Sequence, residues 1–146
     1  MNIKCVVTGY LDENCYVLSK NGTCLIVDPG DDFLKIKEAI GDDKVLGVLI
    51  THSHTDHTGG LKVFNKKYHP KVYISDKILK ESKFNKDEFN IISDLDEIDD
   101  ISIKEIQLSH DVSDIKGYII EENKSSMVYI TDTGYINKGY FDILSN

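Results

Sequence analysis

The stretch that decides the fold is residues 51–60, Thr-His-Ser-His-Thr-Asp-His-Thr-Gly-Gly. It follows Val45–Ile50, a continuous apolar run that is typical of a strand buried on both faces. A tight loop after such a strand can direct several side chains into one cavity. Imidazole nitrogens and carboxylate oxygens suit zinc. A solvated polar loop is the alternative, but the spacing favours metal ligation by His52, His54, Asp56 and His57.

Two further metal-type side chains follow other apolar segments. His110 comes after Ile101–Leu108, and its proximity to the first cluster in a folded chain would make it a ligand rather than a structural histidine. Asp132 directly follows Met127–Thr131 and precedes a glycine by two positions. A carboxylate at that place is well suited to bridge two metals, although a turn aspartate is the alternative.

Other polar residues have weaker patterns. Asp28, in Asp-Pro-Gly, could form an Asx turn, but we favour a role as acceptor that fixes the tautomer of a ligand histidine. His69 precedes a proline far from the clusters and is expected at the surface. Asp111 and Asp114 could be solvated loop acids or local orienting groups, and the pattern does not decide.

The composition indicates one soluble globular domain over residues 1–146, with 40% hydrophobic and 29% charged residues. The net charge of -8 argues against an unaided electrostatic grip on nucleic acid, but bound divalent cations would change the local field. No apolar run approaches the roughly 20 residues of a membrane span, so no membrane partner is expected. Three cysteines without metal spacing predict buried, reduced thiols in a cytoplasmic protein: Cys5, Cys15 and Cys24.

Periodicity and turn signals predict an α/β chain with a sheet-on-sheet core and helices outside. Strands are expected at 3–8, 14–19, 23–28, 45–50, 71–75, 101–108, 117–122 and 127–131. Helices are expected from Asp31 or Asp32, as a cap, to about Ile40, and over 61–68, 76–83 and 137–144. Turns are expected at Asn21-Gly22 and around Asn123 to Ser125.

These motifs resemble the metallo-β-lactamase superfamily. Residues 51–57 are similar to its His-x-His-x-Asp-His signature, and Asp28, His110 and Asp132 match its other motifs in order. The resemblance implies an αββα sandwich with the site at the edge between the sheets. It implies two divalent ions, zinc first, with manganese or iron as alternatives. One ion would be held by His52, His54 and His110, and the other by Asp56, His57 and the bridging Asp132.

The resemblance also implies a hydrolase in which the metals hold a bridging hydroxide and Asp56 orients it or takes its proton. Residues 108–111 and 129–135 resemble the nuclease branches, most of all the small exonuclease-like hydrolases of the Wal (Yyc) operon. Residues 13–16 and 27–30 instead resemble the hydroxyacylglutathione-hydrolase type. The expected partner is therefore nucleic acid, with a small-molecule ester or thioester substrate as the alternative. The oligomeric state is not predicted.

One departure from the superfamily pattern concerns the second metal. The superfamily supplies a final histidine from a later strand, whereas no histidine follows His110 in this chain. We therefore expect a chain shortened at its C-terminus, with only the first sheet and the start of the second. An inactive metal-binding fragment is a third possible function.

Overall fold

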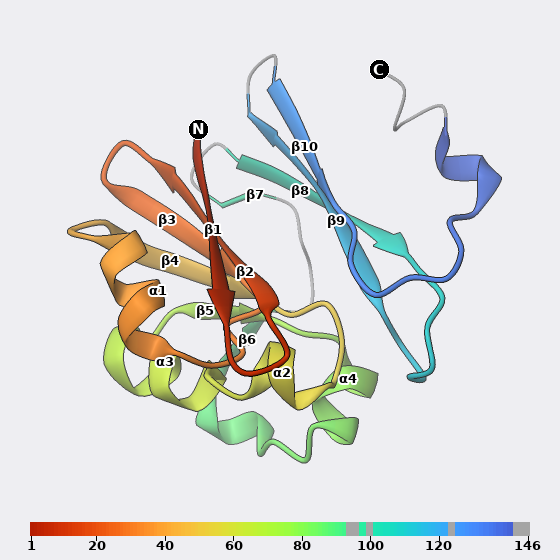
Figure 1. Ribbon diagram of the computed structural model, residues 1–146, viewed down its shortest axis with the longest axis horizontal. Coiled ribbons are helices and arrows are strands. Elements are labelled where there is room, and N and C mark those ends of the chain that lie inside the picture. The colour runs from red at the N-terminus through yellow and green to blue at the C-terminus, as the bar shows by residue number, and fades with distance from the viewer. Residues whose placement is uncertain (93–96, 99–100, 123–124, 142–146) are drawn as a thin grey trace.

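The computed structural model describes residues 1–92, 97–98, 101–122 and 125–141. Two β-sheets pack face to face, and α-helices cover the first sheet on the side away from the second (Figure 1). This arrangement confirms the predicted α/β class and the sheet-on-sheet core. None of the described helices has both the length and the apolar character needed to cross a membrane.

The first sheet is mixed and its strands are arranged in chain order. It consists of β1 (Asn2–Thr8), β2 (Glu13–Lys20), β3 (Thr23–Val27), β4 (Lys44–Leu49), β5 (Lys71–Tyr73) and β6 (Asn90–Ile92). The first three strands pair antiparallel through short turns, and β3 to β6 pair parallel. Parallel pairing requires long crossovers, and these crossovers contain the helices.

The second sheet is antiparallel, with the strand order β10-β9-β8-β7. Its strands are β7 (Glu97–Ile98), β8 (Ile101–Gln107), β9 (Lys116–Glu122) and β10 (Ser125–Tyr129). The segment that follows β10 turns back across the outer face of this sheet, where Tyr140 packs against a small apolar cluster.

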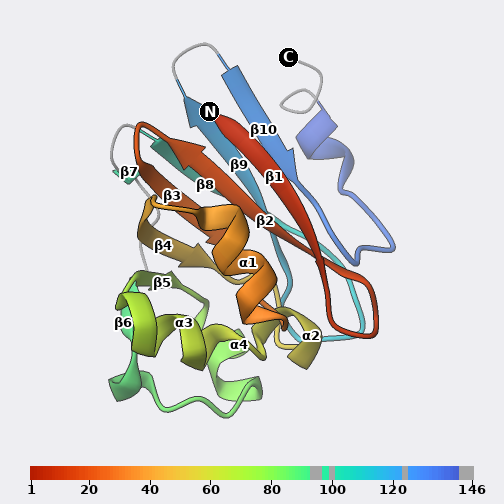
Figure 2. The ribbon, with the colours of Figure 1, turned by 60° about the vertical axis from the view of Figure 1, so that its left-hand side comes forward.

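The helices are short and carry one apolar face each. They are α1 (Phe33–Ile40), α2 (Thr55–Thr58), α3 (Leu61–Tyr68) and α4 (Asp76–Glu81), with 3₁₀ turns η1 (Lys86–Glu88) and η2 (Lys138–Tyr140). Figure 2 shows α1 and α3 side by side across the first sheet. Asp32 directly precedes α1. The sequence predicted Asp31 or Asp32 as the helix cap, but the Asp32 side chain makes no capping hydrogen bond. Its carboxylate instead accepts hydrogen bonds from the Gly9 amide and the Lys35 ammonium.

The core has two layers, and β3 contributes to both. Cys24 and Ile26 belong to the layer beneath the helices, whereas Leu25 and Val27 belong to the layer between the sheets. Both faces of the strand are therefore buried, which explains its uninterrupted apolar sequence. The layer between the sheets fixes the first sheet against the second and positions the loops at the end of β4 near those that follow β8 and β10.

Most predicted elements are confirmed within one or two residues, and α3 has the predicted limits. Cys5 is an exception, because it is exposed on the edge strand β1, whereas Cys15 and Cys24 are buried. The predicted strand 71–75 ends at Tyr73. The predicted helix 137–144 is a 3₁₀ turn in its described part, and residues 142–144 lie outside the described residues, as do 123–124 of the predicted turn.

Candidate metal centre

Asp28, a fully buried carboxylate that follows β3, anchors the first residue of the 51–60 segment, Thr51. Its Oδ1 accepts the Thr51 amide at 2.8 Å, and its Oδ2 accepts the Thr51 hydroxyl at 2.7 Å. The same Oδ2 lies 3.0 Å from Nδ1 of His57. Asp28 therefore does more than form an Asx turn. It makes the contact expected of a group that orients a histidine ligand.

The protonation of His52 follows from its neighbour. The Thr51 hydroxyl donates its single hydrogen to Asp28, so it must accept a hydrogen bond from His52 Nδ1, which lies 3.0 Å away. A neutral His52 ring then carries its lone pair on Nε2. That nitrogen is buried without any hydrogen-bond partner among the described residues. A buried nitrogen lone pair with no protein partner is the geometry that a metal ion would satisfy.

Three histidines converge on one point. The ligand atoms of His52, His54 and His110 all lie within 4.8 Å of one another. The ring centroids of His52 and His54 are 4.7 Å apart, and that of His110 lies 5.5 Å from His52. The first sheet supplies two of these rings and the loop after β8 supplies the third. We call these three residues the histidine group.

A second group lies directly beside the first and shares one member with it. The ligand atoms of His52, His57 and Asp132 also lie within 4.8 Å of one another. Asp132 Oδ2 is 2.8 Å from His57 Nε2 and 3.7 Å from His52 Nε2. The carboxylate therefore lies between the two ring nitrogens, at the position expected of a bridging ligand. We call these three residues the mixed group.

Asp56 lies at the margin of the mixed group. Its Oδ2 is 3.7 Å from His57 Nε2, but it belongs to none of the three-residue groups found among the described residues. Asp56 and His57 are in α2, which the sequence did not predict. The His54 carbonyl begins this single turn by accepting the amides of His57 and Thr58, both at 3.1 Å. The ligand role of Asp56 stays a prediction.

The mixed group lies in a negative environment. Burial opposes a charge on His57, but the hydrogen bond to Asp28 and the neighbouring carboxylates raise its pKa to about 9. Burial raises the pKa of Glu13 to about 8. Burial and the adjacent His57 lower the pKa of His52 to about 4, which keeps its ring neutral. Clustered carboxylates beside a neutral imidazole favour a divalent cation.

Glycines allow two turns of the first sheet, at residues 28–30 and 55–60, to touch. A Cβ on Gly30 would overlap the carbonyl oxygen of Asp56, and a Cβ on Gly60 would lie 2.5 Å from the Pro29 oxygen. The Gly60 amide donates to that Pro29 oxygen at 2.9 Å. The backbone contact between residues 28–30 and α2 therefore requires residues without side chains. This contact fixes the position from which Asp56 and His57 project.

Two residues of the site were not assigned from the sequence. Glu13 is buried, and its Oε1 lies 3.5 Å from His57 Nδ1. It lies on the same face of β2 as the buried Cys15 and Val17. This period-2 pattern would have placed Glu13 on the face of the first sheet that the helices cover. The Tyr129 hydroxyl lies 3.3 Å from Asp28 Oδ2, a contact between the sheets that no local pattern reveals.

The remaining polar residues have distinct places. His69 is exposed at the end of α3, as predicted. Asp114 is buried and accepts hydrogen bonds from Ser75 and Gln107, so it ties the loop after β8 to α4. Asp111 is exposed, and its Oδ1 lies 2.9 Å from His110 Nε2.

Comparison with known proteins agrees with this geometry. The family model described as the metallo-beta-lactamase superfamily matches residues 8–136. The chain belongs to this superfamily. The fold is similar to that in a crystal structure of the metallo-beta-lactamase fold protein YhfI from Bacillus subtilis, which superposes with a TM-score of 0.72 at 19% identity, over 89% of this chain and 58% of that one.

Two sequence relatives carry a nuclease name. Exodeoxyribonuclease YycJ of Bacillus anthracis is 32% identical over 104 residues, which are 64% of this chain and 38% of the relative. Exodeoxyribonuclease WalJ of Streptococcus pneumoniae is 27% identical over 147 residues, 91% of this chain and 55% of the relative. The chain therefore spans about half or less of the length of these curated relatives. The resemblance to the Wal (Yyc) group is confirmed.

Proposed function

We propose that this metallo-hydrolase superfamily member hydrolyses phosphodiester bonds in nucleic acid with the help of two divalent metal ions. The observation that carries the proposal is the unpartnered Nε2 of His52, which is shared by the histidine group and the mixed group. The shared nitrogen would bind one ion, and the remaining donors of the two adjoining groups would serve a second ion next to it. Such pairs of ions are typical of nucleases and phosphatases.

The donor atoms fit the ions. The histidine group would hold one ion, and His57, Asp56 and Asp132 would hold the other, with Asp132 between them. Nitrogen and carboxylate donors suit zinc, and they also accept manganese or iron. Bound there, such ions would lower the pKa of a water molecule and polarise the phosphoryl oxygen.

The residues of the chain supply orientation. Asp28 holds the Nδ1 side of His57, so that the Nε2 of this histidine faces the site. Asp56 lies on the wall of the adjoining cavity, and its carboxylate would accept a hydrogen bond from the attacking water and then its proton. The substrate assignment rests on the nuclease names of relatives that match most of the chain.

Removal of one ligand tests the metal assignment. Elemental analysis of the purified chain should find about two divalent ions per wild-type molecule and about one in His52→Ala, since His52 is a ligand of the ion held by the histidine group. His110→Ala should likewise lose one ion. His69→Ala is the matched control, because His69 is exposed and outside both groups. Equal metal content in wild type and His52→Ala would refute the site.

Activity tests the substrate. With zinc, manganese or iron(II) supplied, the chain should cleave a single-stranded oligonucleotide, and His52→Ala or a chelator should reduce the rate by about 10³-fold or more. A glutathione thioester is assayed in parallel. Thioester cleavage without oligonucleotide cleavage would replace the proposal with an acyl hydrolase. Bound metal with neither activity would identify an inactive metal-binding chain.

A further inference from the structure

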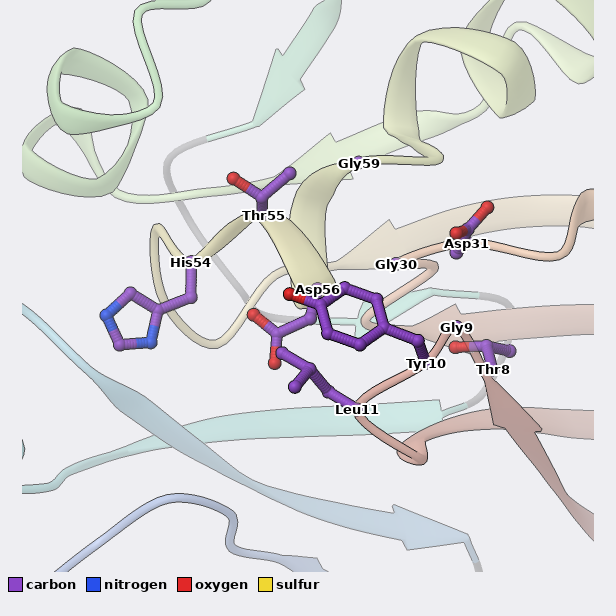
Figure 3. A pocket seen from close by; sticks show the side chains of 10 residues that line it. All are labelled: Thr8, Gly9, Tyr10, Leu11, Gly30, Asp31, His54, Thr55, Asp56 and Gly59. Carbon is purple, nitrogen blue, oxygen red and sulfur yellow. The ribbon is translucent and has the colours of Figure 1, made fainter.

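A cavity of about 480 Å³ adjoins the candidate metal centre. One wall is formed by residues 8–11, in the turn between β1 and β2, and the opposite wall includes His54 and Asp56. Figure 3 shows Tyr10 and Leu11 beside Asp56, with His54 farther along the same segment. A substrate atom at the metals would therefore have its adjacent portion in this cavity.

The turn exposes two large apolar side chains. Tyr10 is 91% exposed and Leu11 is 57% exposed, although both line the cavity. A single exposed apolar residue needs no explanation, but two neighbours at the rim of a candidate active site are in a position to contact a bound substrate. An aromatic ring with free faces can stack on another planar ring.

The turn is held in place from both of its ends. Gly9 and Asp12 adopt left-handed conformations, with φ of 64° and 54°, which bend the chain sharply between the strands. The Gly9 amide donates to Asp32 Oδ2 at 3.1 Å, and the Thr8 hydroxyl donates to Glu13 Oε2 at 3.2 Å. Tyr10 and Leu11 are thus presented by an anchored turn, so little ordering would be needed on binding.

The charge of the cavity indicates which part of a nucleotide fits. Its walls carry the carboxylates of Asp31 and Asp56, and none of its described lining residues is a lysine or arginine. These carboxylates would repel a phosphate group. The cavity therefore favours the uncharged, planar part of a nucleotide, which is the base.

We infer that Tyr10 and Leu11 form a stacking platform for an unpaired base of the substrate, next to the phosphate that is cleaved. This inference rests on the proposed function and narrows its substrate class. A base inside a duplex has both faces covered by its neighbours, so the platform selects single-stranded ends or overhangs. Stacking does not distinguish bases by hydrogen bonding, and little sequence preference is expected.

The test compares a thymidine trinucleotide with a fully abasic trinucleotide of the same backbone. Tyr10→Ala should raise KM for the thymidine substrate by about 10- to 100-fold, the range of one lost stacking contact, and should leave the abasic substrate unaffected. Tyr10→Phe should retain wild-type values, because the ring is kept. Leu11→Ala should also raise KM for the thymidine substrate, whereas the matched control Leu34→Ala should not, since Leu34 is an exposed leucine of α1 outside the cavity.

A binding measurement separates this inference from the proposed hydrolysis. A 2-aminopurine trinucleotide with phosphorothioate linkages should lose fluorescence on binding wild type and Tyr10→Phe, but not Tyr10→Ala. If the probe fluorescence is quenched only when Tyr10 or its ring is present, and the chain cleaves no oligonucleotide, the platform would be supported and the proposed hydrolysis refuted. Cleavage with equal effects of Tyr10→Ala on both trinucleotides, or quenching that is independent of Tyr10, would overturn the platform.

Discussion

The two sheets hold their metal-type side chains in different ways. The first sheet supplies His52 and His57, whose side chains are 0% and 3% exposed. The second sheet supplies His110 and Asp132, whose side chains are 27% and 40% exposed. In the mixed group, the buried His52 and His57 of the first sheet therefore lie against the more exposed Asp132 of the second, whereas the histidine group joins the buried His52 to two more exposed rings, His54 at 40% and His110.

The difference has a structural origin. The buried histidines are oriented by Asp28 and Thr51, and His57 lies in α2, whose backbone contact with Gly30 leaves no room for a side chain there. Asp132 and His110 lie in loops joined by local hydrogen bonds between Thr133 and Ser109. The first sheet therefore preorganises the site, whereas the second sheet completes it. Substitutions in the first sheet should therefore affect both folding and metal binding.

The largest effect is expected from Gly30→Ala. Its new Cβ would overlap the Asp56 carbonyl oxygen, and this backbone cannot move without displacing α2. We expect a loss of roughly 4 kcal/mol or more in the free energy of unfolding, measured by urea denaturation.

The control for this prediction is Gly134→Ala in the second-sheet loop. A Cβ at Gly134 has no neighbour within 4 Å among the described residues, so its effect should stay within about 0.5 kcal/mol. Equal destabilisation by the two substitutions would remove the proposed difference between the sheets.

An intermediate effect is expected from Asp28→Asn. An amide nitrogen cannot accept hydrogen bonds from Thr51 and His57, so the buried network would lose at least one partner. We expect a loss of about 3 kcal/mol in unfolding free energy, together with weaker metal binding.

Asp132→Asn provides the matched case on the second sheet. Its more exposed side chain predicts a stability change below about 0.5 kcal/mol, but a similar loss of metal in elemental analysis. A large stability loss in Asp132→Asn would show that its loop also supports the fold.

The smallest effect concerns a contact that joins the sheets. The buried Tyr118 hydroxyl donates to the Ile50 carbonyl oxygen at 2.5 Å, just before the 51–60 segment. Tyr118→Phe should lower the unfolding free energy by about 1–2 kcal/mol, because it leaves a buried acceptor without this donor. Tyr135→Phe, at an exposed tyrosine, is the control and should show no change in denaturation. No loss in Tyr118→Phe would mean that this hydrogen bond adds nothing to the packing between the sheets.

Much of the fold was predictable because its signals are local. Apolar runs and turn residues identified the strands, and the limits of α3 followed from its periodicity. Cys5 was misassigned because Ile3, Cys5 and Val7 have the alternation of a buried strand face, yet this face of the edge strand is exposed. The tertiary arrangement decides which face of a strand is covered, and a local sequence pattern does not predict that arrangement.

The site was predictable where ligands cluster in sequence. The convergence of His52, His54 and His110 and the central place of Asp132 were expected, and the structure brings these residues together. The Tyr129 contact with Asp28 and the Gly30 contact with α2 depend on the packing of distant segments. No spacing rule connects such pairs.

The hydrogen bond between Tyr129 and Asp28 also has a consequence for biosynthesis, since the two residues are 101 positions apart. At translation rates of roughly 5–20 residues per second, Tyr129 leaves the peptidyl transferase centre about 5–20 s after Asp28. For about half of that interval, between the addition of His57 and that of His110, the nascent chain contains Asp28 and His57 but neither His110 nor Asp132. We expect the choice of metal to be made only after this delay, and ribosome-bound chains that end before His110 should bind zinc weakly.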